Sequence, residues 1–125
     1  MKHRILIVED DKNVSLALST RLSSSGFDVS IAYDAAAAVV EARKNHPDLI
    51  LLDLMLPAGG GAVALQRIRN FASLASTPTI VLTAMRDPFI RSMVSELGIT
   101  AYFEKPYDSG ELLAAIHEAL AAPIQ

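Results

Sequence analysis

The stretch ILIVEDD, residues 5–11, decides the fold class. Four consecutive apolar residues, three of them β-branched, are followed at once by three acidic residues. A short run of this kind is typical of a strand that is buried on both faces. Comparable runs recur at residues 29–32, 49–53, 79–83 and 101–104. We therefore expect five strands.

Helical patterns occupy the segments between these runs. In residues 12–24, apolar residues recur every four positions, which indicates one buried helix face, and Gly26 stands where a helix ends. Asp34 is suited to cap an alanine-rich helix that continues to about residue 45. The remaining features that place helices are the apolar face Val63, Leu65, Ile68 and Phe71, the pair Asp87-Pro88 with a stop at Gly98, and the capping-box pair Asp108 and Glu111.

Strands that alternate with helices predict an α/β domain with a parallel sheet. Right-handed crossovers between parallel strands place helices on both faces of that sheet, which gives a three-layer, doubly wound (βα)5 arrangement. The length of 125 residues and the absence of any linker or repeat favour one domain over residues 1–125.

Composition excludes several classes of protein. The chain has no cysteine, so disulfides, zinc–thiolate sites, iron–sulfur clusters and thiol catalysis are excluded. The net charge is −3 and no long basic run is present, so we expect no direct nucleic-acid binding by this domain. The apolar run after the N-terminus is too short for a signal peptide or a membrane span, and we expect a cytoplasmic protein with no membrane partner.

Reactive side chains follow four of the five expected strands. Glu9 and Asp10 follow the first strand, Asp53 ends the third, Thr83 ends the fourth and Lys105 follows the fifth. Because ligands in open α/β sheets bind outside the carboxyl ends of the strands, we expect these groups to meet at one edge.

Few kinds of functional site fit this combination of acids, a threonine and a lysine. Neighbouring carboxylates repel one another unless a cation joins them. Carboxylates together with a carbonyl and water suit Mg²⁺, whereas the absence of histidine near these strand ends argues against zinc, copper or non-haem iron. A carboxylate can also attack phosphorus, and a lysine and a threonine can then stabilise the phosphoryl oxygens. The set indicates a pocket that accepts a phosphoryl group.

Four motifs in order resemble the receiver domain of two-component response regulators, from about residue 3 to residue 121. They are ILIVEDD at 5–11, DLMLP at 53–57, LTA at 82–84 and Lys105-Pro106. This resemblance implies a flavodoxin-like sheet with strand order 2-1-3-4-5.

The resemblance also assigns roles in the acidic pocket. Asp53 would be the phosphoacceptor, forming a 4-aspartylphosphate with a phosphoryl group from a phosphohistidine. Mg²⁺, with Mn²⁺ as a substitute, would be held by Asp10 directly, by Glu9 through water, by Asp53 and by the backbone carbonyl of Met55.

The remaining roles implied by the resemblance belong to the switch. Lys105 would pair with the phosphoryl group, and Thr83 would bond to it and turn inward on activation. Tyr102 stands at the aromatic position that rotates together with Thr83. Pro106 matches a proline whose preceding peptide bond is often cis.

Some polar residues have a simpler structural interpretation. Asp11 is better explained as a cap or early-turn charge of the first helix than as a metal ligand. Tyr102 also has the alternative of being a half-buried strand residue with no switching role. His3, His46 and His117 are expected on the surface, and the glycines at 59–61 are expected to form a flexible turn.

Three features depart from the commonest receiver pattern. The loop at residues 58–61 usually reads glycine, apolar, acid, glycine, but here it is Ala58-Gly59-Gly60-Gly61, so only the last glycine is retained. Because glycine has high conformational entropy, this loop is predicted to be looser beside Asp53. Met85 places an apolar side chain at a position that the resemblance links to phosphoryl lifetime. Arg91 and Glu111 can form a single ion pair between protomers. Because one exposed ion pair does not drive dimerisation, we expect a monomer or a weak phosphorylation-dependent dimer.

The leading hypothesis is a signalling switch that catalyses its own phosphorylation and slow dephosphorylation, not a metabolic enzyme. Its partners would be a sensor histidine kinase or histidine phosphotransfer protein, and a downstream protein or fused output domain that reads the face formed by the fourth helix, fifth strand and fifth helix. If the chain is complete, its output must pass through a partner. If it is a fragment, an output domain would follow residue 125.

Three other functions are less compatible with the sequence. A haloacid-dehalogenase-type phosphatase needs a second aspartate two residues after the nucleophile, and that position is Met55. A flavin-binding module needs a glycine- and hydroxyl-rich loop after the first strand, which is absent. A pseudo-receiver that never turns over phosphate is disfavoured by the complete set of acids, threonine and lysine, but the altered loop keeps it open.

Overall fold

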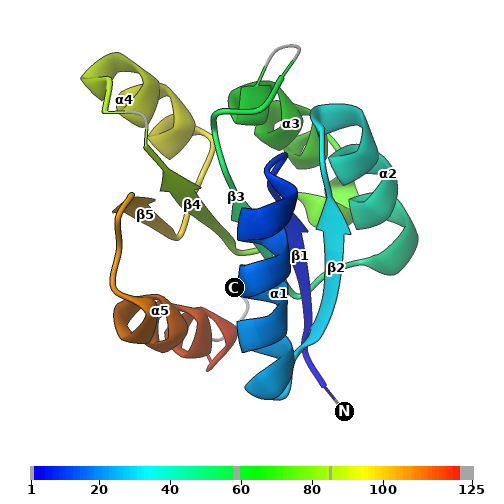
Figure 1. Cartoon of the computed structure of the whole chain (residues 1–125). Coiled ribbons are helices and arrows are strands. Elements are labelled where there is room, and N and C mark those ends of the chain that lie inside the picture. Colours follow the sequence, from blue (N-terminus) through cyan, green and yellow to red (C-terminus); the bar gives the residue numbers. More distant parts are fainter. Residues whose placement is uncertain (1, 58–59, 85, 122–125) are drawn as a thin grey trace.

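A computed structural model describes residues 2–57, 60–84 and 86–121 (Figure 1). Five parallel strands form one sheet in the order β2-β1-β3-β4-β5, which confirms the expected α/β fold and its strand order. The strands are β1 (Arg4–Val8), β2 (Asp28–Ala32), β3 (Leu49–Leu52), β4 (Thr79–Thr83) and β5 (Ala101–Glu104). The helices are α1 (Lys12–Ser24), α2 (Ala35–Asn45), α3 (Gly60–Arg69), α4 (Pro88–Glu96) and α5 (Ser109–Ala121), with a short 3₁₀ helix η1 at Ala72–Leu74 that the sequence patterns do not predict.

The side chains of β1 alternate between the two faces of the sheet. Ile5 and Ile7 belong to one apolar core, and Leu6 and Val8 belong to the other. β1 lies between β2 and β3, so all four side chains are almost completely buried. This double burial explains why the run at residues 5–8 has no polar residue.

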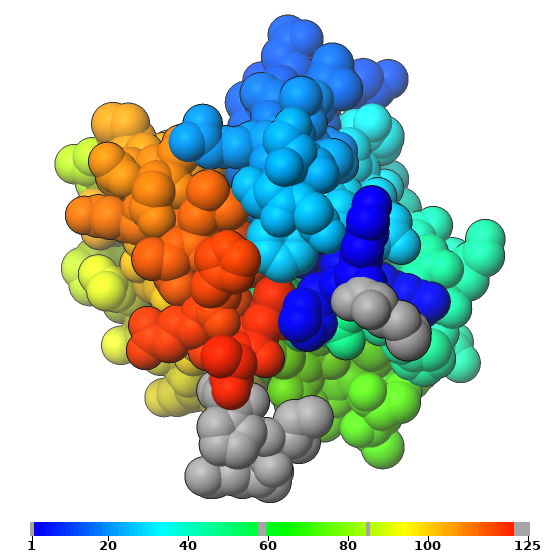
Figure 2. All heavy atoms as spheres, turned by 90° about the horizontal axis from the view of Figure 1, so that it is seen from below, coloured from blue at the N-terminus to red at the C-terminus, as the bar shows by residue number. Residues whose placement is uncertain are grey.

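Helices cover both faces of the sheet. The core that contains Ile5 and Ile7 includes Leu22 of α1 and Ile116 of α5, and these two helices lie side by side (Figures 1 and 2). The core that contains Leu6 includes residues of α2, α3 and α4. Among the described residues, no helix is long and apolar enough to cross a membrane.

Aspartate side chains cap four helices. Asp11 accepts hydrogen bonds from the backbone N–H groups of residues 13 and 14, and Asp34 accepts one from residue 37. Asp87 and Asp108 cap α4 and α5 in the same way. These contacts confirm the predicted caps, including the structural interpretation of Asp11. Val14, expected on the buried face of α1, is instead 38% exposed.

The glycine run differs from its expected form. Gly60 and Gly61 are the first residues of α3 and do not form a turn, while Gly59 lies outside the described residues. The N–H of Gly61 donates to the carbonyl of Leu54 at 2.9 Å. A Cβ at Gly61 would lie 2.7 Å from Leu54 Cα and would overlap the carbonyl oxygen of Asp53. The loop therefore ends in a close backbone contact at Gly61, while residues 58 and 59 lie outside the described residues, so the predicted looseness of the loop is untested.

Arg69, a half-buried residue at the end of α3, bonds to η1, to β4 and to the residues that follow α4. These bonds lie at the end of the sheet where β4 begins. The Arg69 guanidinium donates to the carbonyls of Leu74, Leu97 and Gly98 at 3.0–3.1 Å and to Thr79 Oγ1 at 2.9 Å. Burial lowers the pKa of Arg69. These bonds connect the end of α4 to β4 and η1.

Phe71, which the sequence places on the apolar face of α3, lies just beyond the end of that helix at Arg69.

Candidate functional site

The predicted site residues meet at the carboxyl edge of the sheet. Glu9 follows β1, Asp53 follows β3, Thr83 ends β4 and Lys105 follows β5. Since the strands are parallel and adjacent, their carboxyl ends lie together, and side chains separated by up to 96 positions in the sequence come into contact.

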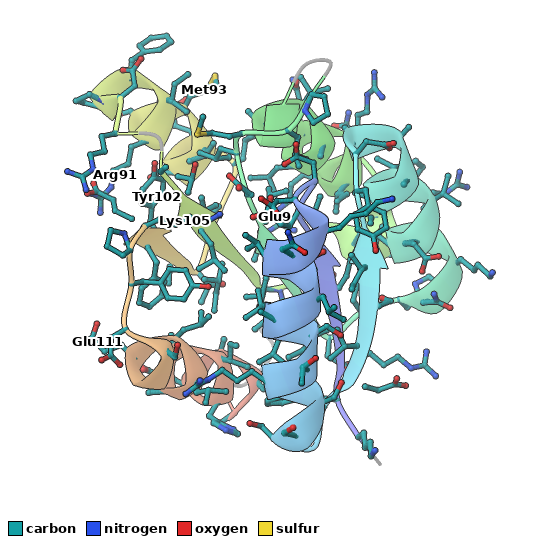
Figure 3. The ribbon with its side chains drawn as sticks, in the orientation of Figure 1. Glu9, Arg91, Met93, Tyr102, Lys105 and Glu111 are labelled. Carbon is teal, nitrogen blue, oxygen red and sulfur yellow. The ribbon has the colours of Figure 1, made fainter. Side chains whose placement is uncertain are left out.

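Lys105 lies between two carboxylates. Its Nζ is 2.8 Å from Glu9 Oε1 and 3.0 Å from Asp53 Oδ2. Figure 3 shows the lysine side chain extending from β5 toward Glu9. The side chains of Glu9 and Asp53 are only 6% and 9% exposed, so both ion pairs are shielded from solvent. Charged pairs of this kind are short and strong because little water competes for them.

The second oxygen of Asp53 is held by the backbone. Oδ1 accepts a hydrogen bond from the N–H of Met55 at 2.9 Å, and the N–H of Asp53 itself donates to the carbonyl of Val8 at 3.0 Å. The β1–β3 pairing and the following turn thereby fix the direction of the Asp53 carboxylate, and its two oxygens have different partners.

Three acidic side chains are close enough to share one cation. One carboxylate oxygen from each of Glu9, Asp10 and Asp53 lies within 4.8 Å of the others, with Asp10 exposed and the other two buried. Among the described residues, the ammonium of Lys105 pairs with Glu9 and Asp53, so these three carboxylates and one ammonium carry a net negative charge. Oxygen ligands and a negative balance fit a hard divalent ion such as Mg²⁺.

Burial perturbs the titration of the site. It raises the pKa of Glu9, and the neighbouring Asp53 charge raises it further, while the hydrogen bond and charge of Lys105 oppose the change. Burial alone would lower the pKa of Lys105, but hydrogen bonds and attraction from Glu9 and Asp53 outweigh it, so the pKa is raised. The Lys105 ammonium therefore stays protonated at neutral pH.

The predicted switch residues lie beside this cluster. Thr83 is completely buried, and its carbonyl accepts a hydrogen bond from the Lys105 N–H at 2.9 Å. Tyr102 is half-buried on β5, opposite Val81 in register. The peptide bond between Lys105 and Pro106 is cis, as the resemblance implied.

Several other candidates lie away from the cluster or outside the described residues. His3, His46 and His117 are all exposed, as expected. Arg91 and Glu111 lie apart within one chain (Figure 3), so their predicted pairing between protomers is untested, and Arg91 Nη1 lies 3.9 Å from Glu104 Oε1. Met85 lies outside the described residues, so the interpretation of that position is untested.

Sequence reasoning did not single out two contributors. Tyr107 lines the same small cavity as Glu9, Asp53 and Lys105, and burial raises the pKa of its hydroxyl. Glu104 carries ion pairs from two arginines at the end of β5. Both flank Lys105 in the chain, so proximity to that motif was the only available signal.

A groove opens beside the acidic cluster. It has a volume of about 490 Å³, and Asp10 and Met55 reach its wall. Its other lining residues are mostly apolar and come from the segment after β3, from α3 and from α4; they are Leu54, Leu56, Pro57, Gly60, Ala62 and Ile90. A small molecule can therefore approach the cluster from this side.

Comparison with known proteins identifies the family. The family model of the response regulator receiver domain matches residues 5–117. The chain therefore belongs to the receiver domains of two-component response regulators. It is 38% identical over 117 residues to the response regulator ArlR of Staphylococcus saprophyticus, covering 94% of this chain and 52% of that protein. It is 37% identical over 117 residues to RpaA of Synechocystis, a DNA-binding transcriptional regulator, covering 94% of this chain and 48% of that protein.

Solved structures agree with this assignment. A CheY-like receiver domain protein from Methanospirillum hungatei superposes with a TM-score of 0.91 at 27% identity, covering 96% of this chain and 94% of that one. The non-phosphorylated receiver domain of HemR from Leptospira biflexa gives a TM-score of 0.89 at 31% identity, covering 99% and 98%. The chain spans about half the length of the curated relatives that it matches.

Proposed function

We propose that residues 1–125 form a single receiver domain that accepts a phosphoryl group on Asp53 and changes its surface in response. The observation that carries this proposal is the position of the Asp53 carboxylate, 3.0 Å from the Lys105 ammonium and within 4.8 Å of carboxylate oxygens of Glu9 and Asp10. That position combines a nucleophile, a fixed cation and a set of ligands for a divalent ion.

The proposed reaction is a transfer between nucleophiles. A carboxylate oxygen of Asp53 attacks the phosphorus of a phosphohistidine on a kinase or phosphotransfer protein. A P–O bond forms while the P–N bond breaks, and the electron pair of that bond stays on the imidazole, which takes up a proton. Slow hydrolysis by water then breaks the P–O bond and returns the Asp53 carboxylate with inorganic phosphate.

The residues around Asp53 support each part of this reaction. Lys105 supplies a fixed positive charge, and its raised pKa keeps that charge in place at neutral pH. Glu9, Asp10, Asp53 and the carbonyl of Met55 would hold Mg²⁺, with Mn²⁺ as a substitute, and the bound ion would neutralise charge on the phosphoryl oxygens. The groove along Asp10 and Met55 gives a small phosphodonor room to approach.

The output would follow from the switch residues. A new phosphoryl group on Asp53 would draw the Thr83 hydroxyl toward it, and Tyr102 would repack as Thr83 moves. The face formed by α4, β5 and α5 would then change its affinity for a downstream protein or a fused output domain. RpaA, one of the longer relatives, is a DNA-binding regulator, so an output domain of that type is one candidate reader of this face. A weak phosphorylation-dependent dimer is the self-association we expect.

The first test is the intact mass of the protein after incubation with acetyl phosphate, with and without Mg²⁺. We expect one phosphoryl adduct that requires Mg²⁺, that is acid-stable and alkali-labile, and that is absent in Asp53→Asn. Asn keeps the size and shape of the side chain, so this variant is a matched control for folding.

A titration with beryllofluoride should accompany the mass measurement, because a missing adduct with a small donor would be ambiguous by itself. Binding of beryllofluoride together with Mg²⁺ would support the proposal even without a stable adduct. If Mg²⁺ binds but neither reagent modifies or occupies Asp53, the phosphoacceptor function is wrong and an interaction module that does not turn over phosphate replaces it.

A further inference from the structure

Tyr107 lies in the short segment between β5 and α5, beside the acidic cluster. It lines the same small cavity as Glu9, Asp53 and Lys105, and its side chain is half-buried. Burial raises the pKa of its hydroxyl; the charge of Lys105 opposes this shift and that of Glu9 adds to it. The phenol is therefore within electrostatic range of the ion pair between Lys105 and Glu9.

The cavity that Tyr107 lines is small and mostly apolar. Its volume is about 10 Å³, which is room for one water molecule at most. Its wall also includes Val14 and Leu18 of α1 and Leu82 of β4. Only 26% of the Lys105 side chain is exposed. On the side of this cavity, apolar side chains therefore separate the lysine from bulk water.

Two neighbouring interactions fix the position of Tyr107. Its ring meets the ring of Phe103 on β5 edge to face, with centroids 6.3 Å apart and planes at 64°. The next residue, Asp108, caps α5 by accepting a hydrogen bond from the N–H of Glu111 at 2.9 Å. Tyr107 is thus held between the end of β5 and the start of α5, where it packs against the core on this face of the sheet.

The direction of the Lys105 ammonium depends on its surroundings, because a lysine stem is long and flexible. Glu9 and Asp53 hold this ammonium at 2.8 and 3.0 Å. Both carboxylates are also proposed ligands of the divalent ion, and Asp53 is the proposed phosphoacceptor. The attraction of both carboxylates for the ammonium therefore weakens as the reaction proceeds, and the packing beside Lys105 then limits how far its side chain can move.

We propose that Tyr107 is a positioning residue for phosphoryl transfer, whose ring closes the cavity side of Lys105 and keeps the ammonium directed at Asp53. The inference rests on the proposed function and adds one residue to it. A displaced ammonium stabilises the charge on the phosphoryl oxygens less well, so the rate of transfer falls when the ring is lost.

The first test measures the rate of phosphorylation by acetyl phosphate at saturating Mg²⁺, from the intact mass as a function of time. Tyr107→Ala should lower this rate about three- to tenfold, because Lys105 gains room to move. Tyr107→Phe keeps the ring and should react like the wild type. Tyr107→Leu keeps part of the apolar volume and should show a smaller loss, which provides a second variant if Tyr107→Ala does not fold.

Leu120→Ala is the matched control for a loss of packing. Leu120 is a partly buried residue of α5 that packs against the same core as Tyr107, but it does not line the cavity beside Lys105. Its truncation should lower the free energy of unfolding and leave the phosphorylation rate unchanged.

The ammonium of Lys105 provides a second readout that does not depend on phosphorylation. Heteronuclear NMR of the lysine ammonium groups measures how fast their protons exchange with water, and Lys105→Met identifies the signal. Because shielding slows this exchange, Tyr107→Ala should speed it several-fold, while Tyr107→Phe and Leu120→Ala should not.

Three results would overturn the inference. They are an unchanged rate in Tyr107→Ala, an equal loss of rate in Tyr107→Phe or Leu120→Ala, and a loss of rate in Tyr107→Ala with unchanged exchange of the Lys105 ammonium. Failure of the wild-type protein to accept a phosphoryl group or to bind beryllofluoride is a different result. It would contradict the proposed function, while the exchange measurement would still decide whether Tyr107 shields Lys105.

Discussion

The Nζ atom of Lys105 lies 2.8 Å from Glu9 Oε1, although the two residues are 96 positions apart in the sequence. The same Nζ lies 3.0 Å from Asp53 Oδ2, so a single ammonium links the ends of β1, β3 and β5. The charge of the site therefore depends on one ammonium, the buried carboxylates of Glu9 and Asp53, and the exposed carboxylate of Asp10.

Lys105→Met should strengthen the binding of a divalent ion while it weakens phosphorylation. The ammonium repels any cation that approaches Glu9 and Asp53, and its removal leaves the carboxylates free to serve as ligands. We expect a several-fold gain in Mg²⁺ affinity, equivalent to about 1 kcal/mol, measured by isothermal titration calorimetry. Weaker Mg²⁺ binding in this variant would contradict the proposed ligand set.

Glu9→Gln should raise the free energy of unfolding at neutral pH. Burial and the charge of Asp53 raise the pKa of Glu9 above its ordinary value of 4.5, which means that the folded protein binds this proton more tightly than the unfolded chain does. Ionisation of Glu9 therefore costs stability in the folded state as the pH rises above 4.5. A neutral glutamine avoids this cost, and we expect a gain on the order of 1 kcal/mol.

The pH dependence makes this prediction specific. The stability gain of Glu9→Gln should be absent below pH 4.5, should grow as the pH rises, and should level off above the raised pKa of Glu9. Urea unfolding at a series of pH values measures it. A gain that is constant with pH would show that ionisation of Glu9 is not its source.

Gly61→Ala should destabilise the protein and disturb Asp53. The added Cβ would meet backbone atoms, with Leu54 Cα at 2.7 Å and the Asp53 carbonyl oxygen still closer, so the start of α3 must shift. Forced overpacking of this kind costs about 1–3 kcal/mol. Gly110→Ala is the matched control, because the nearest atom there is a side-chain oxygen of Asp108 at 3.0 Å. Equal unfolding free energies for the two variants would contradict the close contact.

Arg69→Met should lower the free energy of unfolding by about 2 kcal/mol. Methionine preserves much of the apolar length of the side chain but leaves Thr79 Oγ1 and the carbonyls of Leu97 and Gly98 without this donor. Arg67→Ala, two residues earlier and exposed, should change the stability little. Chemical denaturation distinguishes the two, and a similar small effect in both variants would show that the Arg69 bonds contribute little.

The sequence by itself determined the strands, the helix caps and the residues at the carboxyl edge. These features are local: a buried strand needs an uninterrupted apolar run, as in residues 5–8, and an N-cap needs a short acceptor such as Asp34 directly before the helix. The place of Glu9, Asp53, Thr83 and Lys105 at one edge then followed from the parallel arrangement of the strands.

Only the tertiary structure decided which side chains touch. The sequence shows three glycines in a row, but the tertiary structure decides that α3 begins at Gly60 and that the Gly61 N–H donates to the carbonyl of Leu54. Likewise, Arg91 is a charged residue on a helix until the placement of α4 beside β5 brings it over Tyr102 and near Glu104. The physical reason is range: propensity and capping act within a few residues, whereas these contacts depend on the three-dimensional register of distant elements.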